Sequence, residues 1–194
     1  MQSMISTKGR YALKVMVELA EHDAEGAALI RRDDRVSVML NEEDHLRIQA
    51  FGSGEQLQQA AEDAFAVEDV LQRRLSFAFD RQLGYLTACP TNIGTGLRAS
   101  VMLHLPMLTI LKQMGKVNQL ASKLGLTIRG IYGEGSEAQG YLYQLSNQVT
   151  LGRTEQEILE AVQAVARQLS EMEQVFREKT WEKDEVGFSD QLSR

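Results

Sequence analysis

The chain has 194 residues, 43% of them hydrophobic and 25% charged, which is enough apolar material for one domain with a hydrophobic core. Its net charge of -6 argues against a protein held to nucleic acid by a general basic field. A single cysteine excludes an internal disulfide, and no apolar run approaches the roughly 20 residues that cross a bilayer. We therefore expect a cytoplasmic protein with no membrane partner.

Residues 1–25 are predicted to form one amphipathic helix ahead of the main domain. Their apolar residues recur at helical spacing, with Ser6 or Thr7 as the cap. The stretch from Ile5 to His22 resembles the first helix of winged-helix repressors that respond to cysteine or iron-sulfur status. No recognition helix accompanies it, so direct DNA binding is not expected. We interpret this helix as a packing element or a fusion remnant.

Residues 26–180 are predicted to form the main domain, followed by a polar tail over 181–194. Alternating or continuous apolar patterns predict strands, and longer periodic patterns predict helices. The expected strands are 27–31, 36–40, 45–51, 99–105, 126–132 and 141–150, and the expected helices are 55–81, 106–114, 117–124 and 154–179. Strands interleaved with helices of unequal length predict an α+β fold with a largely antiparallel sheet flanked by helices.

Three local features of the sequence predict specific details of the fold. Pro106 is expected to open a helix, because its ring suits the first helical position. Thr154 and Glu157 have the spacing of a capping box at the start of the last helix. The apolar stripe from Met102 to Leu108 is interpreted as core.

An acidic turn links two predicted strands, with the sequence Asn41-Glu-Glu-Asp-His45. Seen alone, three consecutive acids would normally be a solvated turn. The strand that follows places Arg47 on the face opposite Leu46 by alternation. A carboxylate and a guanidinium could therefore share one site.

The single cysteine lies in a loop of unusual composition, Cys89-Pro-Thr-Asn-Ile-Gly-Thr-Gly-Leu-Arg98. Proline and two glycines are poor helix or strand material, so we expect a rigid exposed loop. A lone cysteine could also be a small buried hydrophobe. The Cys-Pro-Thr-Asn-x-Gly-Thr setting of Cys89 argues against that interpretation and leaves a reactive thiolate as the other one.

A third stretch, Arg129-Gly-Ile-Tyr-Gly-Glu134, again places a carboxylate near an arginine. Together, the three stretches resemble the catalytic motifs of the phosphagen (guanidino) kinase superfamily. The continuation Gly-Ser-Glu-Ala after Glu134 is similar to its bacterial branch, the protein-arginine kinases of the McsB type. The resemblance runs from about Gly26 to about Arg177, which is most of the chain.

This resemblance implies a role for each matching residue. Glu43 and Glu134 match the paired carboxylates that orient the substrate guanidinium, and Cys89 matches the cysteine that lies against it. Arg47, Arg98 and Arg129 match arginines that hold the nucleotide phosphates. The remaining residues implied to line the nucleotide site are Ala99, Ser100, Val101, Met102, Gly130, Ile131, Tyr132 and Gly133, together with Glu134 itself.

The resemblance also implies ATP with Mg²⁺ as the phosphoryl donor and arginine-bearing proteins as substrates. Partners in the family are a zinc-binding activator adaptor, a heat-shock repressor and a Clp protease, within a stress response, and a homodimer is a further expectation. No metal-ligand residues are assigned in the chain itself.

One departure from the family pattern keeps alternatives open. The family's Ser-Ser-Arg-x-Arg segment, whose arginines also bind phosphate, has no counterpart before residue 26, so we expect a truncated catalytic domain. The favoured function is transfer of the γ-phosphoryl group of ATP to arginine residues in proteins. The alternatives are a catalytically incomplete fragment that binds a nucleotide or a partner, and a kinase of a small guanidino compound.

Overall fold

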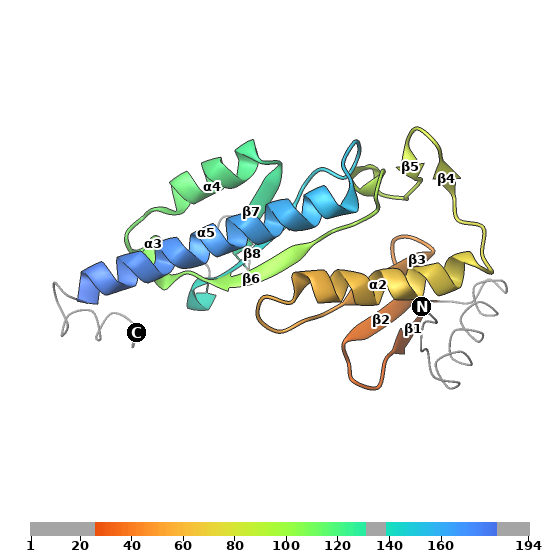
Figure 1. The fold of residues 1–194 in the computed structure, drawn as a ribbon, viewed down its shortest axis with the longest axis horizontal. Helices are drawn as coiled ribbons and strands as arrows, with labels where there is room; N and C mark the ends of the chain where they lie inside the picture. The colour runs from red at the N-terminus through yellow and green to blue at the C-terminus, as the bar shows by residue number, and fades with distance from the viewer. Residues whose placement is uncertain (1–25, 131–138, 182–194) are drawn as a thin grey trace. The chain divides into compact units, whose positions relative to one another are not determined.

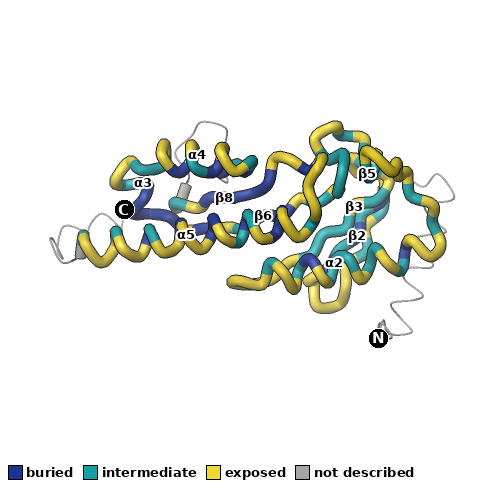
Figure 2. The backbone as a smooth tube through the Cα atoms, turned by 45° about the horizontal axis from the view of Figure 1, so that its top comes forward, coloured by how far each residue is buried: buried dark blue, intermediate teal, exposed yellow. Residues whose placement is uncertain are grey.

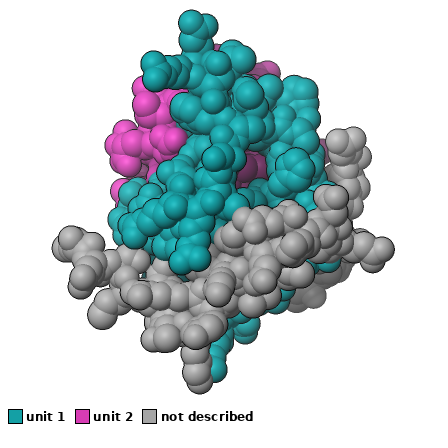
Figure 3. All heavy atoms as spheres, turned by 90° about the vertical axis from the view of Figure 1, so that its right-hand side faces the viewer, with its two compact units in different colours: residues 1–97 teal, residues 98–194 magenta. Residues whose placement is uncertain are grey.

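The computed structural model describes residues 26–130 and 139–181 of the chain. The chain divides into two compact units, residues 1–97 and residues 98–194, which are coloured separately in Figure 3. The predicted helix within residues 1–25 and the last two residues of the predicted strand over 126–132 lie outside the described residues.

The first unit is built on an antiparallel sheet in the order β1 (Ala27–Ile30), β2 (Val36–Leu40) and β3 (Leu46–Ala50), as Figure 1 shows. Alternate residues of β2, namely Val36, Val38 and Leu40, are no more than 5% exposed. Helix α2 (Leu57–Gln72) covers this apolar face, packs on β3, and places Val67 against the cluster of Val38 and Leu40. The three predicted strands are confirmed.

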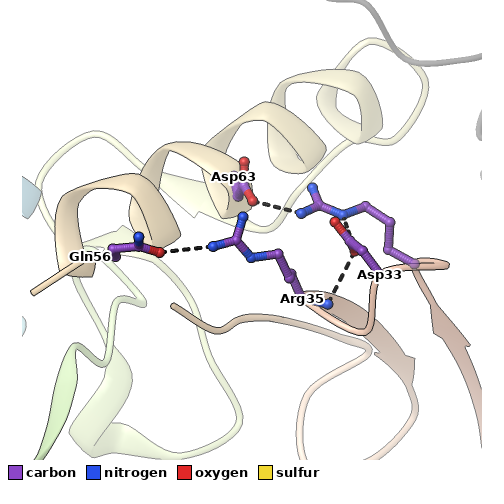
Figure 4. Close-up of polar contacts among 5 residues, drawn as sticks. Asp33, Arg35, Gln56 and Asp63 are labelled. Atoms are coloured by element: carbon purple, nitrogen blue, oxygen red, sulfur yellow. Dashed lines mark hydrogen bonds and ion pairs between the residues drawn. The ribbon is translucent and has the colours of Figure 1, made fainter. Parts of the chain in front are cut away.

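The turn between β1 and β2 is tied to α2 by side chains, as Figure 4 shows. Arg31 donates one hydrogen bond to Asp33 (2.7 Å) and another to Asp63 of α2 (2.8 Å), and Arg35 donates to Gln56 (2.8 Å). The hydrogen bond from Arg31 holds the pKa of Asp33 below its ordinary value. Since these groups are exposed, the bonds fix geometry more than they add stability.

The prediction of one helix over residues 55–81 is wrong beyond Gln72, where α2 ends. The following segment forms a two-stranded hairpin of β4 (Phe79–Asp80) and β5 (Gly84–Tyr85). The rings of Phe77 and Phe79 meet the ring of Tyr85 edge to face, with centroids 6.1 Å and 5.2 Å apart. These contacts with a residue later in the chain replace the helical packing that the spacing predicts.

The second unit is an antiparallel sheet in the order β6 (Ser100–His104), β8 (Leu142–Asn147) and β7 (Leu126–Gly130). The long helix α5 (Glu155–Trp181) packs on β6 and β8, while α4 (Met114–Lys123) packs on β7. Leu145, Val162 and Leu169 are completely buried, and Figure 2 shows the buried stretch of β8, in dark blue, next to α5. The antiparallel α+β architecture is confirmed in both units.

The segment after β6 differs from the prediction in one respect. The short helix α3 (Pro106–Ile110) does begin at Pro106, but it ends before the expected Met114. Lys112 takes a left-handed backbone conformation with φ of 56°, which breaks the helix, and α4 then begins at Met114. The backbone N–H groups at the start of α3 are bound by Glu173 of α5.

The predicted capping box at the start of α5 is confirmed. The backbone N–H of Thr154 donates to the Glu157 carboxylate (2.9 Å), and the N–H of Glu157 donates to the Thr154 hydroxyl (3.2 Å). The first of these bonds is the main reason that the pKa of Glu157 lies below its ordinary value. The lowered pKa stabilises the fold above the ordinary pKa of a glutamate, and this contribution is lost as the pH falls through the lowered value.

Replacing the cap should destabilise the second unit measurably. A Thr154→Ala variant loses the hydroxyl acceptor and should unfold about 1 kcal/mol more easily in urea. A Thr154→Ser variant keeps the acceptor and is the matched control, for which a midpoint close to that of the native sequence is expected. Equal midpoints for the Ala and Ser variants would show that the hydroxyl does not cap α5.

Candidate functional site

The acidic turn connects β2 to β3 and is closed by a backbone bond from Asn41 to His45 (3.1 Å). Asn41 takes a left-handed conformation with φ of 53°, which asparagine tolerates better than most residues. The turn leaves Glu43 exposed to solvent, at a position where its carboxylate can meet a ligand.

Arg47 reaches back from β3 to the same turn. Its guanidinium donates to the carboxylate of Glu42 at 2.6 Å, and both side chains are nearly half exposed. The expected sharing of one site by a carboxylate and Arg47 is therefore present, with Glu42 rather than Glu43 as the partner. A guanidinium has five donor hydrogens, so the pair with Glu42 leaves others available to a phosphate.

The cysteine loop is held by short-range hydrogen bonds. Cys89 precedes a single turn of 3-10 helix (Pro90–Asn92), and its carbonyl accepts from the N–H of Asn92 (3.0 Å) and from the hydroxyl of Thr87 (2.8 Å). The half-buried Sγ of Cys89 lies 3.0 Å from the hydroxyl oxygen of Thr91. These bonds hold the backbone of the loop and the position of the sulfur.

The structure brings the acidic turn and the cysteine loop together. The carboxylate of Asp44 accepts a hydrogen bond from the backbone N–H of Ala88 at 2.5 Å, although the two residues are far apart in the sequence. Glu43 and Cys89 are the immediate neighbours of these two residues. Sequence analysis assigned no role to Asp44, and its place within the acidic run was the only signal that could have singled it out.

In the second unit, some of the residues predicted to bind the nucleotide lie together on the exposed face of the sheet. Cross-strand pairing puts Met102, Gln144 and Arg129 in one row, because Gln144 pairs with both of the others. Met102 is 53% exposed and Arg129 is also exposed, whereas Val101 lies on the opposite face, in a row with the fully buried Leu145. The prediction that Met102 belongs to the core is therefore wrong.

The start of the predicted nucleotide segment is anchored by a residue that sequence analysis missed. The backbone N–H of Ala99 donates to the Asn147 side chain (2.8 Å), and the N–H of Asn147 donates to the Ala99 carbonyl (3.3 Å). Both residues are buried, while the neighbouring Arg98 and Ser100 are exposed. The two bonds between Ala99 and Asn147 therefore fix the backbone next to Arg98, whose side chain stays at the surface.

The remaining predicted residues fall into two groups. Glu134 and the preceding Ile131, Tyr132 and Gly133 lie outside the described residues, whereas Gly130 ends β7. Glu43, Arg47 and Cys89 belong to the first unit, and Arg98 and Arg129 to the second. That these residues act on one substrate stays a prediction.

Within residues 26–130 and 139–181, no three His, Cys, Asp or Glu side chains gather as ligands of a metal ion. In those same ranges, no helix combines the length and apolar character needed to span a bilayer.

Comparison with known sequences gives the family. Residues 3–176 match the family described as ATP:guanido phosphotransferase, C-terminal catalytic domain. The chain is 51% identical over 176 residues to the protein-arginine kinase of Brevibacillus brevis, covering 91% of this chain and 49% of that protein. For the protein-arginine kinase of Bacillus subtilis, the identity is 48% over 169 residues, covering 87% and 47%. The chain thus spans about half the length of the curated relatives it matches.

The family match overlaps the expected domain boundary at residue 26 but does not test it. It begins at residue 3, so it includes most of the stretch that sequence analysis set apart as 1–25. The boundary at residue 26 and the repressor-like origin of the first helix stay predictions.

Solved structures give the same fold. The duplicated taurocyamine kinase of Schistosoma mansoni with bound transition state analog components superposes with a TM-score of 0.68 and 30% identity, covering 89% of this chain and 26% of that one. Lombricine kinase superposes with a TM-score of 0.69 at 23% identity, covering 92% and 54%. The phosphagen-kinase catalytic fold expected from the three motifs is confirmed, and the chain belongs to the ATP:guanido phosphotransferase family, within its C-terminal catalytic domain.

Proposed function

We propose that the chain transfers the γ-phosphoryl group of ATP to the guanidinium group of arginine residues in proteins. The observation that carries the proposal is the bond from Ala88 to Asp44, which holds the exposed Glu43 and the half-buried Cys89 on adjoining segments. The protein-arginine kinases at about half identity favour a protein substrate over a small one.

The reaction needs a base because a guanidinium is protonated at neutral pH and has no free lone pair. In the proposed step, a guanidinium nitrogen attacks the γ-phosphorus, an N–P bond forms, and the bond from that phosphorus to the ADP oxygen breaks. The proton leaves the nitrogen for a carboxylate, and we propose Glu43, which is exposed on its turn, for this role. Glu134 is proposed as the second carboxylate that orients the substrate.

Cys89 is proposed to lie against the substrate guanidinium as a thiolate. A negative sulfur would add a contact to the substrate cation, and the hydroxyl of Thr91, 3.0 Å from the sulfur, can donate to it. This arrangement orients the substrate without a covalent bond to the enzyme.

The nucleotide phosphates are proposed to bind the exposed guanidinium groups of Arg98 and Arg129, together with Arg47. Guanidinium forks match phosphate oxygens and stabilise the charge that spreads over the transferring group. Within the second unit, Met102 lies in one row with Arg129 on the open sheet face, and Ser100 lies two residues after Arg98 in the chain. Mg²⁺ is proposed to bind together with the nucleotide, where it would be held by phosphate oxygens and water and would neutralise charge on the phosphates.

The location of the protein in the cell, its biological role, its assembly and its partners are proposed from the family resemblance alone. These are a cytoplasmic location, a role in the stress response, a homodimer, and the three partners: the zinc-binding adaptor, the heat-shock repressor and the Clp protease.

The test is incubation of the purified chain with labelled ATP, Mg²⁺ and an arginine-rich protein. Label that survives base but is lost in acid identifies an N–P bond. The expected result is such label on the protein, and its loss in the Cys89→Ala and Glu134→Gln variants.

Two other outcomes would overturn the proposal, each in favour of a named alternative. Label on free arginine or taurocyamine alone would identify a kinase of small guanidino compounds, a reading that the likeness to taurocyamine kinase favours. Nucleotide binding without any transfer would identify a binding fragment.

A further inference from the structure

The loop that carries Cys89 is closed at its two ends by one residue pair. The backbone N–H of Tyr85 donates to the Gly94 carbonyl (2.8 Å), and the N–H of Gly94 donates to the Tyr85 carbonyl (3.3 Å). Cys89 lies midway between these two residues, so the position of Tyr85 sets where the loop begins and ends.

The closure is tight enough to require glycine beside it. A Cβ on Gly84, which has φ of +77°, would lie 2.3 Å from the Gly94 carbonyl oxygen. A Cβ on Gly96 would meet the Tyr85 side chain at 3.8 Å, which is ordinary contact. The end of the loop, at Gly94 and Gly96, therefore packs against both the backbone and the side chain of Tyr85.

The side chain of Tyr85 is held from the other direction by α2. Its hydroxyl donates to the carboxylate of Glu68 and accepts from the amide of Gln72 at 2.6 Å. The same amide also donates to Glu68 at 3.1 Å, so the three polar groups form a closed triangle. The rings of Phe77 and Phe79 pack edge to face on the tyrosine ring.

We infer that Tyr85 is a positioning residue that fixes the Cys89 loop against helix α2, and that Glu68 and Gln72 act through its hydroxyl. Its relevance to phosphotransfer rests on the function proposed above. The hydroxyl has one hydrogen and accepts one more bond here, so both polar contacts are matched. The aromatic contacts alone leave the ring free to tilt, because edge-to-face packing has a broad energy minimum.

The test uses the full chain and the reactivity of its one cysteine. A Tyr85→Phe variant keeps the ring but loses both bonds of the hydroxyl, so the loop should open more often. At a fixed neutral pH, we expect iodoacetamide to alkylate Cys89 about fivefold faster in this variant than in the native chain. This is the factor expected when the closed loop loses the net stabilisation of about one hydrogen bond relative to its locally open form.

The matched control is Tyr143→Phe in the second unit. The hydroxyl of Tyr143 also makes a partly buried bond, to Thr109 at 2.8 Å, so this variant loses a similar contact without touching the loop. Its alkylation rate should equal that of the native chain. Equal rates for the native, Tyr85→Phe and Tyr143→Phe chains would overturn the inference and assign the tyrosine a structural role alone.

The cysteine readout needs no turnover, so it decides the inference even if the proposed phosphotransfer fails. In a chain that does transfer phosphate, Tyr85→Phe should lower kcat about tenfold while the dissociation constant for ATP stays unchanged, because orientation of the guanidino group is lost. A Glu68→Gln variant keeps an acceptor for the hydroxyl and should alkylate at a rate closer to native than Glu68→Ala does. Equal rates for these two variants would contradict the role given to Glu68.

Discussion

A Glu43→Gln variant is expected to lose about 10²- to 10⁴-fold in the rate of phosphotransfer, the range typical of a removed general base. The amide keeps the size of the side chain but cannot accept the guanidinium proton. Since Glu43 is exposed on its turn and Asp44 makes the bond to the cysteine loop, the fold should be unaffected. The measurement is the initial rate of acid-labile labelling, with binding of ATP measured separately.

Two comparisons make the Glu43 result specific. Glu62→Gln removes an exposed carboxylate from α2 and should leave the rate unchanged, which controls for net charge. Glu43→Asp keeps the carboxylate but withdraws it by one methylene, so its rate should lie between those of the native chain and the amide variant. A Glu43→Gln rate within about threefold of native would remove this residue from the mechanism, since general bases contribute far more.

The features that sequence analysis predicted correctly are those fixed by neighbouring residues. The alternation of Val36, Val38 and Leu40 identifies β2 because every second residue must face the core. The Thr154–Glu157 box predicts the start of α5 because both of its bonds lie within one turn.

The features that were missed depend on contacts between distant residues. The segment from 73 to 81 contains no glycine or proline, and the packing of Phe77 and Phe79 on Tyr85 after the end of α2 depends on a residue later in the chain. The exposure of Met102 likewise depends on pairing between distant strands, which puts it in the row of Gln144 and Arg129, opposite the row of the buried Leu145. Apolar character alone does not say which face a strand residue takes.

The candidate site shows the same division. The motif resemblance singled out Glu43 and Cys89 by type and spacing, but it could not show that Asp44 binds the backbone of Ala88. The anchoring of Ala99 by Asn147 is also invisible in a sequence, because both partners are common residues with no special neighbours. Residues proposed to touch the substrate are thus easier to predict than those that hold them in place.

The largest effect on stability is expected from Glu173, a carboxylate that is only 4% exposed. Its two oxygens accept from the backbone N–H groups of Met107 (2.8 Å) and Leu108 (3.0 Å), and Arg177 lies 3.6 Å from one of them. These N–H groups belong to the first turn of α3, where no helical partner is available. Glu173 therefore joins α5 to the segment that directly follows β6.

A Glu173→Ala variant should lower the free energy of unfolding by about 3 kcal/mol, because two buried N–H groups lose a charged acceptor and a cavity remains. Glu173→Gln keeps a single acceptor oxygen and should cost roughly half as much, which gives a measurable variant if the alanine form does not fold. The measurement is the urea midpoint, and Glu171→Ala on the exposed side of α5 is the matched control. Because β6 carries Ser100 and Met102, the Gln variant should also bind ATP more weakly. A Glu173→Ala midpoint equal to that of Glu171→Ala would mean that the start of α3 is satisfied without this carboxylate.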